Sequence, residues 1–372
     1  MGHKMNVAID LTSLDDNFSG IERYTLCITK ELIKDQSINF LLIFKNKIKF
    51  FKPGELAQPN VKTAILRGNR VKILLFSLPK FINGSKPDAA LFFAFPPSFL
   101  SRLRKDIKVY TTIHDMVVFD VPKTMTFKSR VFFKLGYRYA AKRSEKIFTV
   151  SNFSRERIHH LLKRNVDDIL VTYNGCDIKP SIQSVDSKIK KDVPAHYLLC
   201  LSTIEPRKNF RWLIEQMGTI WKKDDSIPDL VIVGRKGWKT EKLLSKIGFD
   251  TKEKLHFLGF VDDKSLPYIY SHSDCFVFPS IYEGFGIPVI EATILNSLPL
   301  CSDIPTSIEI LSDDYPYFFK LNDKADFYVK LKSILSLGSQ QKDELLQQTR
   351  KKFQIYTWKL SAKRILDVIK LS

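Results

Sequence analysis

The stretch YEGFGIPVIEA, residues 282–292, joins a strand-like segment to a helix-like one and carries two glutamates eight positions apart. The preceding CFVFPS (275–280) is short, apolar and aromatic, as expected of a buried strand. The following IPVIEATILN has a helical pattern with Pro288 in its first turn, where the missing N–H is harmless. The stretch therefore predicts a strand–loop–helix unit, whose free N–H groups and flexible glycines can hold an anion such as a diphosphate.

Similar strand-like runs alternate with helix-like patterns along the whole chain, from MNVAID (5–10) to LPLCSD (298–303). This alternation predicts an α/β fold with doubly wound parallel sheets. A chain of 372 residues exceeds what one hydrophobic core usually organises, so we expect two domains. The polar segment 176–196, which has no clear period, separates the two series of strands.

We therefore expect an N-terminal Rossmann-like domain over residues 1–180 and a C-terminal one over 181–355. A final helix is expected over 356–372, for which a return to the N-terminal domain is one option. Two such domains form a central cleft where the carboxyl ends of their strands face each other, and ligands bind at such edges.

Positive charge is concentrated in the first half of the chain. The formal net charge is +19, and residues 1–180, with 31 Lys and Arg against 16 Asp and Glu, carry +15 of it. A field of this sign suits nucleic acid, an anionic membrane surface or a phosphate-bearing substrate, although a merely solvated basic surface explains many such cases. Basic and apolar residues lie side by side in 43–54 and 127–144, as an anionic lipid interface favours.

The cysteines and the hydropathy narrow the class of protein. The five cysteines are far apart and show no metal-ligand spacing, and no uncharged apolar run reaches 18 residues. These features predict an intracellular protein with reduced thiols and no membrane-spanning helix.

By its residues alone, the stretch 282–292 has three interpretations. It resembles a truncated dinucleotide-binding fingerprint, but Val289 stands where a third glycine is needed, and no acidic residue ends a second strand further on. In a plainer interpretation Glu283 only complements the helix dipole and Glu291 faces solvent. In the third, both carboxylates face one cleft beside an anion site.

The wider pattern FPSIYEGFGIPVIEA (278–292) resembles the E-x7-E signature of glycosyltransferase family 4, the retaining GT-B enzymes also called glycosyl transferases group 1. Other segments fall in the order of that family's two domains: FSGIERYT (18–25), TTIHDM (111–116), TVSNFSRERI (149–158), LSTIEPRKNF (201–210), LVIVGRKGW (230–238), the run 255–280 and LPLCSDIPTSIEI (298–310). The resemblance covers nearly the whole chain. It implies a GT-B fold of two Rossmann-like domains facing a central cleft.

The resemblance assigns roles to two acids and two cations of the second domain. Glu283 would bind hydroxyls of the donor sugar as a catalytic residue, and Glu291 would accept from the ribose of the nucleotide. Lys208 first, and Arg207 second, would supply positive charge to the leaving diphosphate. Thr203 stands five positions before Lys208, where one common form of the family has an arginine.

Further donor contacts follow from the same resemblance. Backbone amides around Phe285, Gly286 and Ile287 would meet the diphosphate. Gly20 would let the backbone approach the donor phosphate, and it is otherwise a turn glycine.

The base pocket and the reacting carbon complete the implied site. Gly259 and Phe260 would wall the base pocket, and the plain alternative is that aromatics there belong to the core. His114, at the end of the strand-like run VYTTIHD, would contact the donor sugar near the reacting carbon, although a lone histidine is more often structural.

No D-x-D occurs in the chain, so no acidic pair is available to hold a divalent ion on the diphosphate. We therefore expect neither a metal requirement nor a cofactor, with the sugar nucleotide as donor substrate.

The predicted function is a metal-independent, retaining hexosyltransferase of O-antigen or capsule assembly. It would use a GDP-, UDP- or dTDP-linked donor, with mannose as the first candidate sugar and rhamnose or another hexose as alternatives. The acceptor would be a saccharide or a lipid-linked saccharide, and the protein would be cytoplasmic, in peripheral contact with an anionic membrane. An NAD-dependent oxidoreductase and a basic nucleic-acid-binding protein are the two other interpretations.

Overall fold

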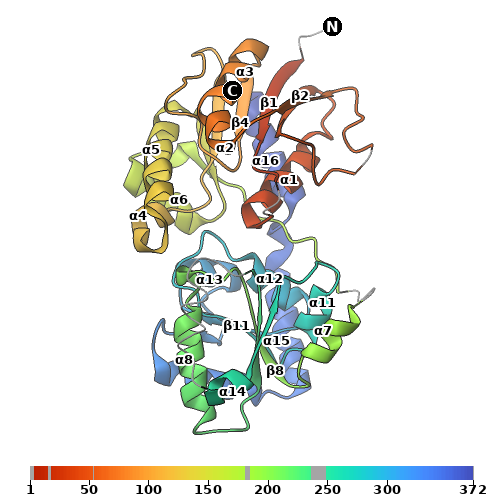
Figure 1. Ribbon diagram of the computed structural model, residues 1–372, viewed down its shortest axis with the longest axis vertical. Helices are drawn as coiled ribbons and strands as arrows, with labels where there is room; N and C mark the ends of the chain where they lie inside the picture. The colour runs from red at the N-terminus through yellow and green to blue at the C-terminus, as the bar shows by residue number, and fades with distance from the viewer. Residues whose placement is uncertain (1–3, 16–17, 53, 181–184, 236–248, 372) are drawn as a thin grey trace. The chain divides into compact units, whose positions relative to one another are not determined.

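The computed structural model describes residues 4–15, 18–52, 54–180, 185–235 and 249–371. The chain divides into two compact units, here called unit 1 (Met1–Gly175 with Tyr356–Ser372) and unit 2 (Cys176–Ile355). Each unit is built on one parallel sheet with helices packed on it (Figure 1). The chain thus returns to its first unit at the C-terminus.

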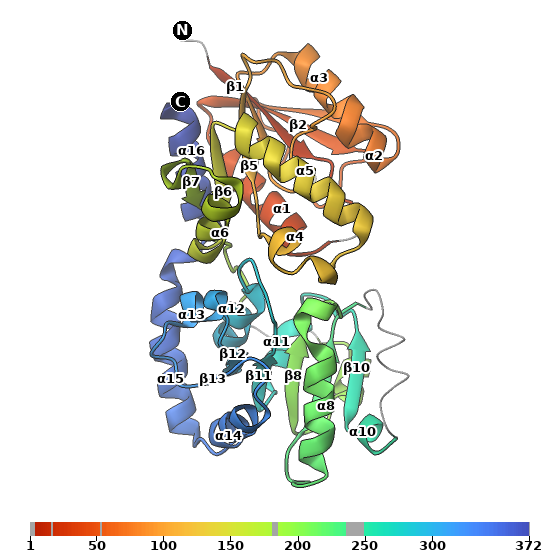
Figure 2. The ribbon, with the colours of Figure 1, turned by 90° about the vertical axis from the view of Figure 1, so that its left-hand side faces the viewer.

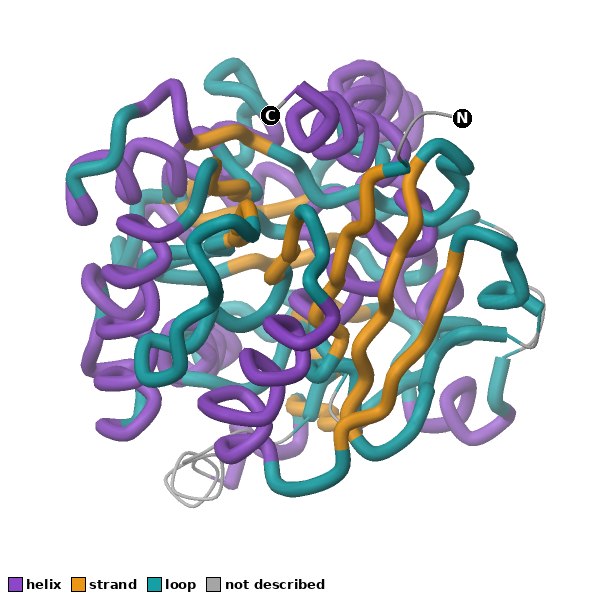
Figure 3. Tube along the Cα trace, turned by 90° about the horizontal axis from the view of Figure 1, so that it is seen from above, coloured by secondary structure: helices purple, strands orange, loops and turns teal. Residues whose placement is uncertain are grey.

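Seven parallel strands form the sheet of unit 1, in the order β3-β2-β1-β4-β5-β6-β7. Their bounds are β1 (Met5–Leu11), β2 (Ile38–Lys45), β3 (Val61–Leu66), β4 (Ala89–Phe92), β5 (Lys108–Thr112), β6 (Lys146–Thr149) and β7 (Ile169–Val171). The longest strands of this sheet, β1, β2 and β3, come first in the sequence and lie side by side (Figure 3). The order reverses between β1 and β4, so the carboxyl ends of these two strands form the switch point of a doubly wound sheet, where such folds bind ligands.

Helices and short turns connect these strands. They are α1 (Gly20–Leu32), α2 (Arg70–Lys72) with the π-helical turn Ile73–Ser77, α3 (Leu78–Ser85), α4 (Val117–Asp120), α5 (Phe127–Arg143), α6 (Asn152–Leu162) and α16 (Trp358–Leu371). On one side of the sheet Ala8, Ile43 and Phe92 pack against Ile73 and Leu78, which forms one layer of the core.

The C-terminal helix α16 belongs to unit 1 and lies against α1 and β7 (Figure 2). Its buried face carries Trp358 and Ile365 at helical spacing. The Ser361 hydroxyl donates to the Tyr173 carbonyl at 2.6 Å, and the Arg364 guanidinium donates to the Val171 carbonyl at 2.9 Å. These bonds fix the last helix beside β7, the edge strand of the sheet.

Unit 2 has six parallel strands in the order β10-β9-β8-β11-β12-β13. Their bounds are β8 (Tyr197–Leu201), β9 (Asp229–Val233), β10 (Leu255–Gly259), β11 (Cys275–Phe278), β12 (Pro299–Ser302) and β13 (Phe318–Phe319). Its helices are α7 (Ser187–Asp192), α8 (Phe210–Trp221), α10 (Phe249–Glu253), α11 (Leu266–Ser271), α12 (Ile287–Ile294), α13 (Pro305–Leu311), α14 (Lys324–Leu335) and α15 (Ser339–Lys351). The switch point of this sheet lies between β8 and β11.

Two doubly wound parallel sheets confirm the α/β fold class that the sequence predicts. The strand–loop–helix prediction at 275–296 corresponds to β11, its loop and α12. Within the described ranges, no helix combines the length and the apolar composition that crossing a bilayer requires. Of the boundary segment 176–196, residues 181–184 lie outside the described part of the chain.

Candidate functional site

The candidate site of unit 2 lies at the switch point of its sheet. After β8 the chain makes a 3-10 turn over Pro206–Lys208, passes through Asn209 in the left-handed region (φ 59°) and enters α8. After the neighbouring β11 a short loop leads into α12. Because both strands are parallel and adjacent, the two loops meet at the same edge. The Ile281 N–H donates to the Arg207 carbonyl at 2.8 Å and ties the loops together.

Glu283 lies in the loop after β11 and contacts the loop after β8. Its carboxylate accepts from the Lys208 ammonium at 2.5 Å, the Arg207 guanidinium at 2.9 Å and the Ser280 hydroxyl at 2.7 Å. Only 6% of Glu283 is exposed. Three charge-assisted bonds to one buried carboxylate fix its position far more firmly than a solvent-exposed pair would. We call Arg207, Lys208 and Glu283 the ion group.

The charges within the ion group shift the pKa values of Glu283 and Lys208. Burial alone would raise the pKa of Glu283, but the positive charges of Lys208 and Arg207 and the hydrogen bonds outweigh it and lower this pKa to about 2. Glu283 is therefore ionised at neutral pH. Burial, together with the like charge of Arg207, lowers the pKa of Lys208, while the carboxylate of Glu283 opposes that change. An additional anion at the site would favour the charged ammonium.

Helix α12 begins beside the ion group. Gly286 precedes it with φ 130°, a conformation that side chains disfavour, so this position requires glycine. Pro288 has no N–H and the Val289 N–H donates to the Gly286 carbonyl at 3.0 Å, so the Ile287 N–H is the donor that the first turn can offer to an anion. Phe285 contributes a buried ring, with 4% exposed.

Glu291 lies one turn inside α12 and is 3% exposed, so the interpretation that it faces solvent is wrong. The Tyr270 hydroxyl of α11 donates to its carboxylate at 3.4 Å. A carboxylate has two acceptor oxygens, and Tyr270 donates to one of those of Glu291. The structure thus joins Glu283 with the two cations and Glu291 with Tyr270.

The carboxyl ends of β9 and β10 present an aromatic ring to solvent. Gly259 has φ 70°, and its carbonyl accepts from the Gly234 N–H at 2.8 Å. The following Phe260 is 64% exposed, so the interpretation that it belongs to the core is wrong. The guanidinium carbon of Arg235 lies 4.8 Å from the centroid of this ring. Such a cation–π pair is a flat, exposed platform.

Arg235 is the residue that the sequence reasoning missed. It lies two residues after the end of β9, as the turn of Arg207 follows β8, and a basic residue close after a buried strand was the available signal. Residues 236–238 of the motif LVIVGRKGW lie outside the described residues.

In unit 1 His114 follows β5 and is 8% exposed. Burial lowers its pKa to about 4, so the ring is neutral at neutral pH. Its Nε2 lies 2.7 Å from the Phe93 carbonyl, which can only accept, so Nε2 carries the proton and Nδ1 is left as an acceptor. The Tyr24 ring meets the imidazole edge-on, with centroids 5.0 Å apart, and holds its plane.

Gly20 is the first residue of α1, and a Cβ there would meet no atom within 4 Å. Packing therefore does not require a glycine at this position. The Ser19–Glu22 capping box already stabilises the start of the helix.

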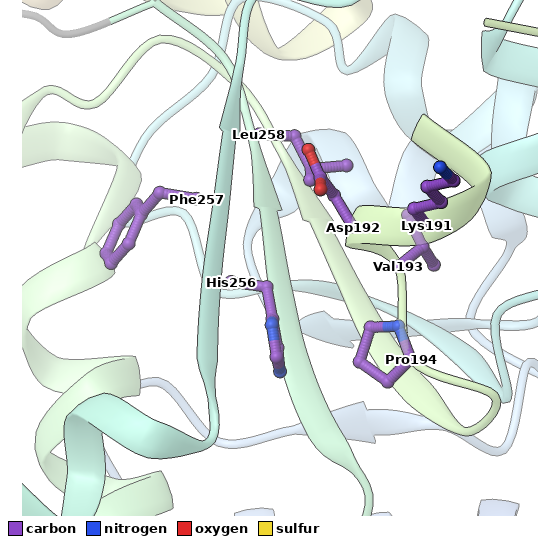
Figure 4. Close-up of a pocket in the computed structure, with 7 residues that line it drawn as sticks. All are labelled: Lys191, Asp192, Val193, Pro194, His256, Phe257 and Leu258. Atoms are coloured by element: carbon purple, nitrogen blue, oxygen red, sulfur yellow. The ribbon is translucent and has the colours of Figure 1, made fainter. Parts of the chain in front are cut away.

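A separate cavity of about 460 Å³ lies in unit 2, between the segment that precedes β8 and residues 256–258 of β10 (Figure 4). Pro194 precedes β8 there, and His256, the second residue of β10, bonds the Asp229 carboxylate at 2.8 Å. None of the predicted site residues lines this cavity. Because doubly wound sheets bind ligands at their carboxyl edge, it is not the donor site.

Comparison with known proteins gives two family matches. The family model "Glycosyl transferases group 1" matches residues 181–353, and "Glycosyltransferase Family 4" matches residues 18–179. Among curated relatives, an O-antigen chain mannosyltransferase B of Escherichia coli is 28% identical over 312 residues, which is 79% of this chain and 81% of that protein. An O-antigen chain mannosyltransferase of Salmonella typhimurium is 29% identical over 206 residues, 55% of each chain.

Solved structures match the fold over nearly the full length. A glycosyltransferase of Rickettsia africae superposes with a TM-score of 0.71 at 18% identity, covering 100% of this chain and 99% of that one. The glycosyltransferase WaaG, involved in lipopolysaccharide biosynthesis, gives a TM-score of 0.70 at 14% identity, covering 98% and 99%. Anabaena HepE, solved in complex with UDP-glucose, gives a TM-score of 0.70 at 14% identity, covering 98% and 100%. The fold is therefore the GT-B fold.

The buried ion group predicts a pH-dependent contribution to stability. Because the pKa of Glu283 falls from its ordinary 4.5 to about 2 in the folded state, its contribution is complete above 4.5 and is lost as the pH falls toward 2. We expect Glu283→Gln to lower the free energy of unfolding by about 3 kcal/mol at neutral pH, since it removes the carboxylate that Lys208 and Arg207, two partly buried cations, share. Urea unfolding of the variant and the wild type between about pH 3 and pH 7 measures the difference.

Glu215→Gln is the matched control, because Glu215 pairs with Arg211 on an exposed helix face, where the two side chains are 55% and 70% exposed. Its effect should stay within about 0.5 kcal/mol at every pH. A difference for Glu283→Gln that is equally small, or that does not shrink in acid, would contradict the ion group as described.

Proposed function

We propose a reaction for this chain, which belongs to family 4 of the glycosyltransferases, the glycosyl transferases group 1. It moves a hexose from a nucleotide diphosphate sugar to a hydroxyl of a saccharide or lipid-linked saccharide, with retention of configuration at the anomeric carbon. The observation that carries this proposal is the ion group at the switch point of unit 2. Family membership sets aside the oxidoreductase and the nucleic-acid-binding interpretations.

The leaving group of such a transfer is a nucleoside diphosphate, which gains negative charge as its bond to the sugar breaks. Lys208 and Arg207 are held at the strand edge by Glu283, so their charges are in position before the reaction begins. Preorganised cations stabilise developing charge without the cost of reorganising solvent. The Ile287 N–H at the start of α12 adds a further donor to the diphosphate.

Glu283 has two functions in this proposal. It fixes both cations, and its ionised carboxylate accepts from hydroxyls of the donor sugar. Glu291 accepts from the ribose hydroxyls, beside Tyr270. Gly259 and the exposed ring of Phe260 border the base, and Gly20 leaves room for the donor phosphate.

His114 contributes as a neutral acceptor. With Nε2–H committed to the Phe93 carbonyl, Nδ1 can accept from a sugar hydroxyl close to the reacting carbon. A pKa near 4 makes the imidazolium scarce at neutral pH, so His114 does not act as the acid of the reaction.

Mannose is the first candidate for the sugar, because two of the relatives are named as O-antigen chain mannosyltransferases. The corresponding donor is GDP-mannose, and rhamnose or another hexose on UDP or dTDP is the alternative. Assembly of O-antigen, or of a capsule, is the corresponding process.

Nucleotide binding tests the proposal directly. We expect GDP, UDP or dTDP to raise the melting temperature of the full chain, with GDP giving the largest shift, whereas NAD and an oligonucleotide give none. Lys208→Gln should remove most of that shift, because the diphosphate loses a charge-assisted bond. The control Lys332→Gln removes a cation bound to Asp224 at 2.7 Å in the same unit, and it should leave the shift unchanged. Stabilisation by NAD or the oligonucleotide alone would eliminate the proposal.

The reaction should not need a divalent ion. Within the described ranges, no group of three or more His, Cys, Asp or Glu side chains is arranged to hold a metal. In the proposal Lys208, Arg207 and the start of α12 neutralise the negative charge of the leaving diphosphate, which a metal ion neutralises in other enzymes. We expect EDTA to leave the transfer rate within about twofold, less than the loss of one electrostatic donor causes. Strict dependence on added magnesium would refute this part of the mechanism.

Unit 1 is proposed to contact an anionic membrane from the cytoplasmic side through α5. Phe127, Val131 and Leu135 recur every four residues on this helix and are 69%, 41% and 44% exposed. Arg130 stacks on the ring of Phe127, and the exposed row thus lies among cations. An apolar row flanked by positive charge suits the headgroup region of an anionic bilayer.

Vesicle flotation tests this contact. We expect the wild type to float with phosphatidylglycerol vesicles and not with phosphatidylcholine vesicles. The double variant Phe127→Ser/Leu135→Ser should lose most of the floating fraction, since it removes the apolar part of the contact. Val329→Ser is the control, because Val329 is equally accessible (62% exposed) but lies on α14 of unit 2. Equal flotation of all three proteins would contradict the proposal.

A further inference from the structure

We propose that Arg350 of α15 is a positioning residue for the nucleotide, because it holds the short helix that carries Glu291. Arg350 does not touch the ligand itself. It binds the carboxyl end of α12 and thereby fixes the carboxylate that accepts from the ribose hydroxyls. The inference rests on the proposed function, since it adds a residue to the donor site described there.

Helix α12 is short, and its last turn carries a residue of the donor site. The helix spans eight residues, Ile287–Ile294, which make about two turns. Glu291 is the fifth of them, and its own carbonyl accepts from the Leu295 N–H at 2.9 Å. The last carbonyls of a helix have no donor inside the helix and need one from elsewhere. If the last turn of α12 opened, the side chain of Glu291 would move with it.

Arg350 supplies these donors from the last turn of α15. Its Nε and Nη2 donate to the Thr293 carbonyl at 2.9 and 2.8 Å, and Nη2 also reaches the Ile294 carbonyl at 3.3 Å. The same nitrogen bonds the side-chain oxygen of Asn296, which follows the helix in the left-handed region with φ 66°. A planar guanidinium that binds three neighbouring groups fixes the orientation of the helix end, and its positive charge complements the negative end of the helix dipole.

The end of α15 is itself fixed in unit 2. The side chain of Thr349, next to Arg350, is 2% exposed. Two residues after Arg350, the Lys352 ammonium bonds the Asp314 carboxylate at 2.6 Å and the Leu311 carbonyl at 3.1 Å, at the end of α13. The carboxyl ends of α12 and α13 are therefore attached to neighbouring residues of one segment, which gives Arg350 a firm base.

The groups of the donor site lie between the two ends of α12. Gly286 and the Ile287 N–H are at the amino end, beside the loop of Glu283. Glu291 is two residues before Thr293, so it is the group nearest to the carbonyls that Arg350 binds. A binding site works only when its groups are held within about 0.5 Å of the productive geometry. Loss of Arg350 should therefore disturb the ribose contact first.

A purely structural role is the alternative, and binding measurements separate the two. A helix cap that only stabilises the fold lowers the free energy of unfolding, but it leaves the affinity of the folded protein for a nucleotide unchanged. A positioning residue changes that affinity even when the protein is fully folded. Because Arg350 acts through Glu291, the loss of affinity should also depend on whether the Glu291 carboxylate is present.

The experiment is calorimetric titration of the full chain with GDP, or with UDP or dTDP if only that nucleotide stabilises the wild type. It is done at a temperature at which thermal unfolding shows each variant to be folded. We expect Arg350→Gln to weaken binding about tenfold, since a small misplacement of a binding group is costly. Glu291→Gln should also weaken it about tenfold, through the loss of charge-assisted bonds. The double variant should bind as weakly as Glu291→Gln alone, because the arginine then has no carboxylate to position.

Arg350→Lys is the conservative variant. It keeps the charge but lacks the planar fork, so it should bind the nucleotide only about threefold more weakly than the wild type. It also takes the place of Arg350→Gln if that protein does not fold. Arg164→Gln is the matched control, because Arg164 binds the Ala141 and Glu145 carbonyls at 3.1 and 2.6 Å, at the end of α5 in unit 1. This control should bind the nucleotide as the wild type does.

The outcomes are distinct. Wild-type affinity in folded Arg350→Gln, or in Arg350→Lys if only that variant folds, overturns the positioning role. A full further loss when Arg350→Gln is added to Glu291→Gln overturns it as well, because the arginine would then act by another route. An equal loss in Arg164→Gln would indicate a general effect of weakening the fold and has the same consequence.

Failure of the proposed function looks different. If GDP, UDP and dTDP all fail to bind the wild type, the proposed function itself fails. Full affinity in Glu291→Gln refutes the ribose contact, and this inference with it. Normal binding by the wild type and weaker binding by Glu291→Gln, with unaltered binding by the arginine variants, rejects only this inference.

Discussion

A carboxylate with 6% of its surface exposed lies between an arginine and a lysine that come 75 residues or more before it in the chain. Moving the two loops apart would separate this poorly solvated carboxylate from both cations, which is costly, so the loops after β8 and β11 must keep their present relation. That relation depends in turn on the order of the strands, which makes β8 and β11 neighbours, and on Gly286, which lets α12 begin directly after the loop. The architecture of unit 2 thus holds the ion group in position before any ligand arrives.

Ion pairs also join loops at the carboxyl edge of the unit 1 sheet. There Lys45 and Arg70, at the ends of β2 and β3, both pair with Asp15 after β1, as Lys208 and Arg207 both pair with Glu283 in unit 2. In unit 2 the loop that carries Glu283 leads into α12, which begins at Ile287 and carries a second buried acid, Glu291. The +15 charge of residues 1–180 gives this part of the chain a long-range attraction for anions.

Much of this was predictable from the sequence, because short apolar strands and glycine-containing turns have strong local signals. The fold class and the strand–loop–helix unit at 275–296 follow from such signals and are confirmed. Side-chain partnerships across long sequence separations were not predictable. Nothing local to Glu283 indicates that Arg207 and Lys208 bind it, and nothing local to Phe260 indicates that its ring is exposed beside Arg235. The burial of Glu291 was not predictable either, because its exposure depends on contacts with α11, a separate helix that contributes Tyr270. The donor roles of Gly20, His114, Glu283 and Glu291 stay predictions.

The central claim is that the ion group receives the diphosphate of the donor, and a crystal structure of the chain with GDP tests it most directly. The account predicts the terminal phosphate about 3 Å from the Lys208 ammonium and from the Ile287 N–H at the start of α12, with the ribose against Glu291. A nucleotide bound elsewhere in unit 2, for example in the cavity beside His256, with the ion group unchanged and without a ligand, would contradict it.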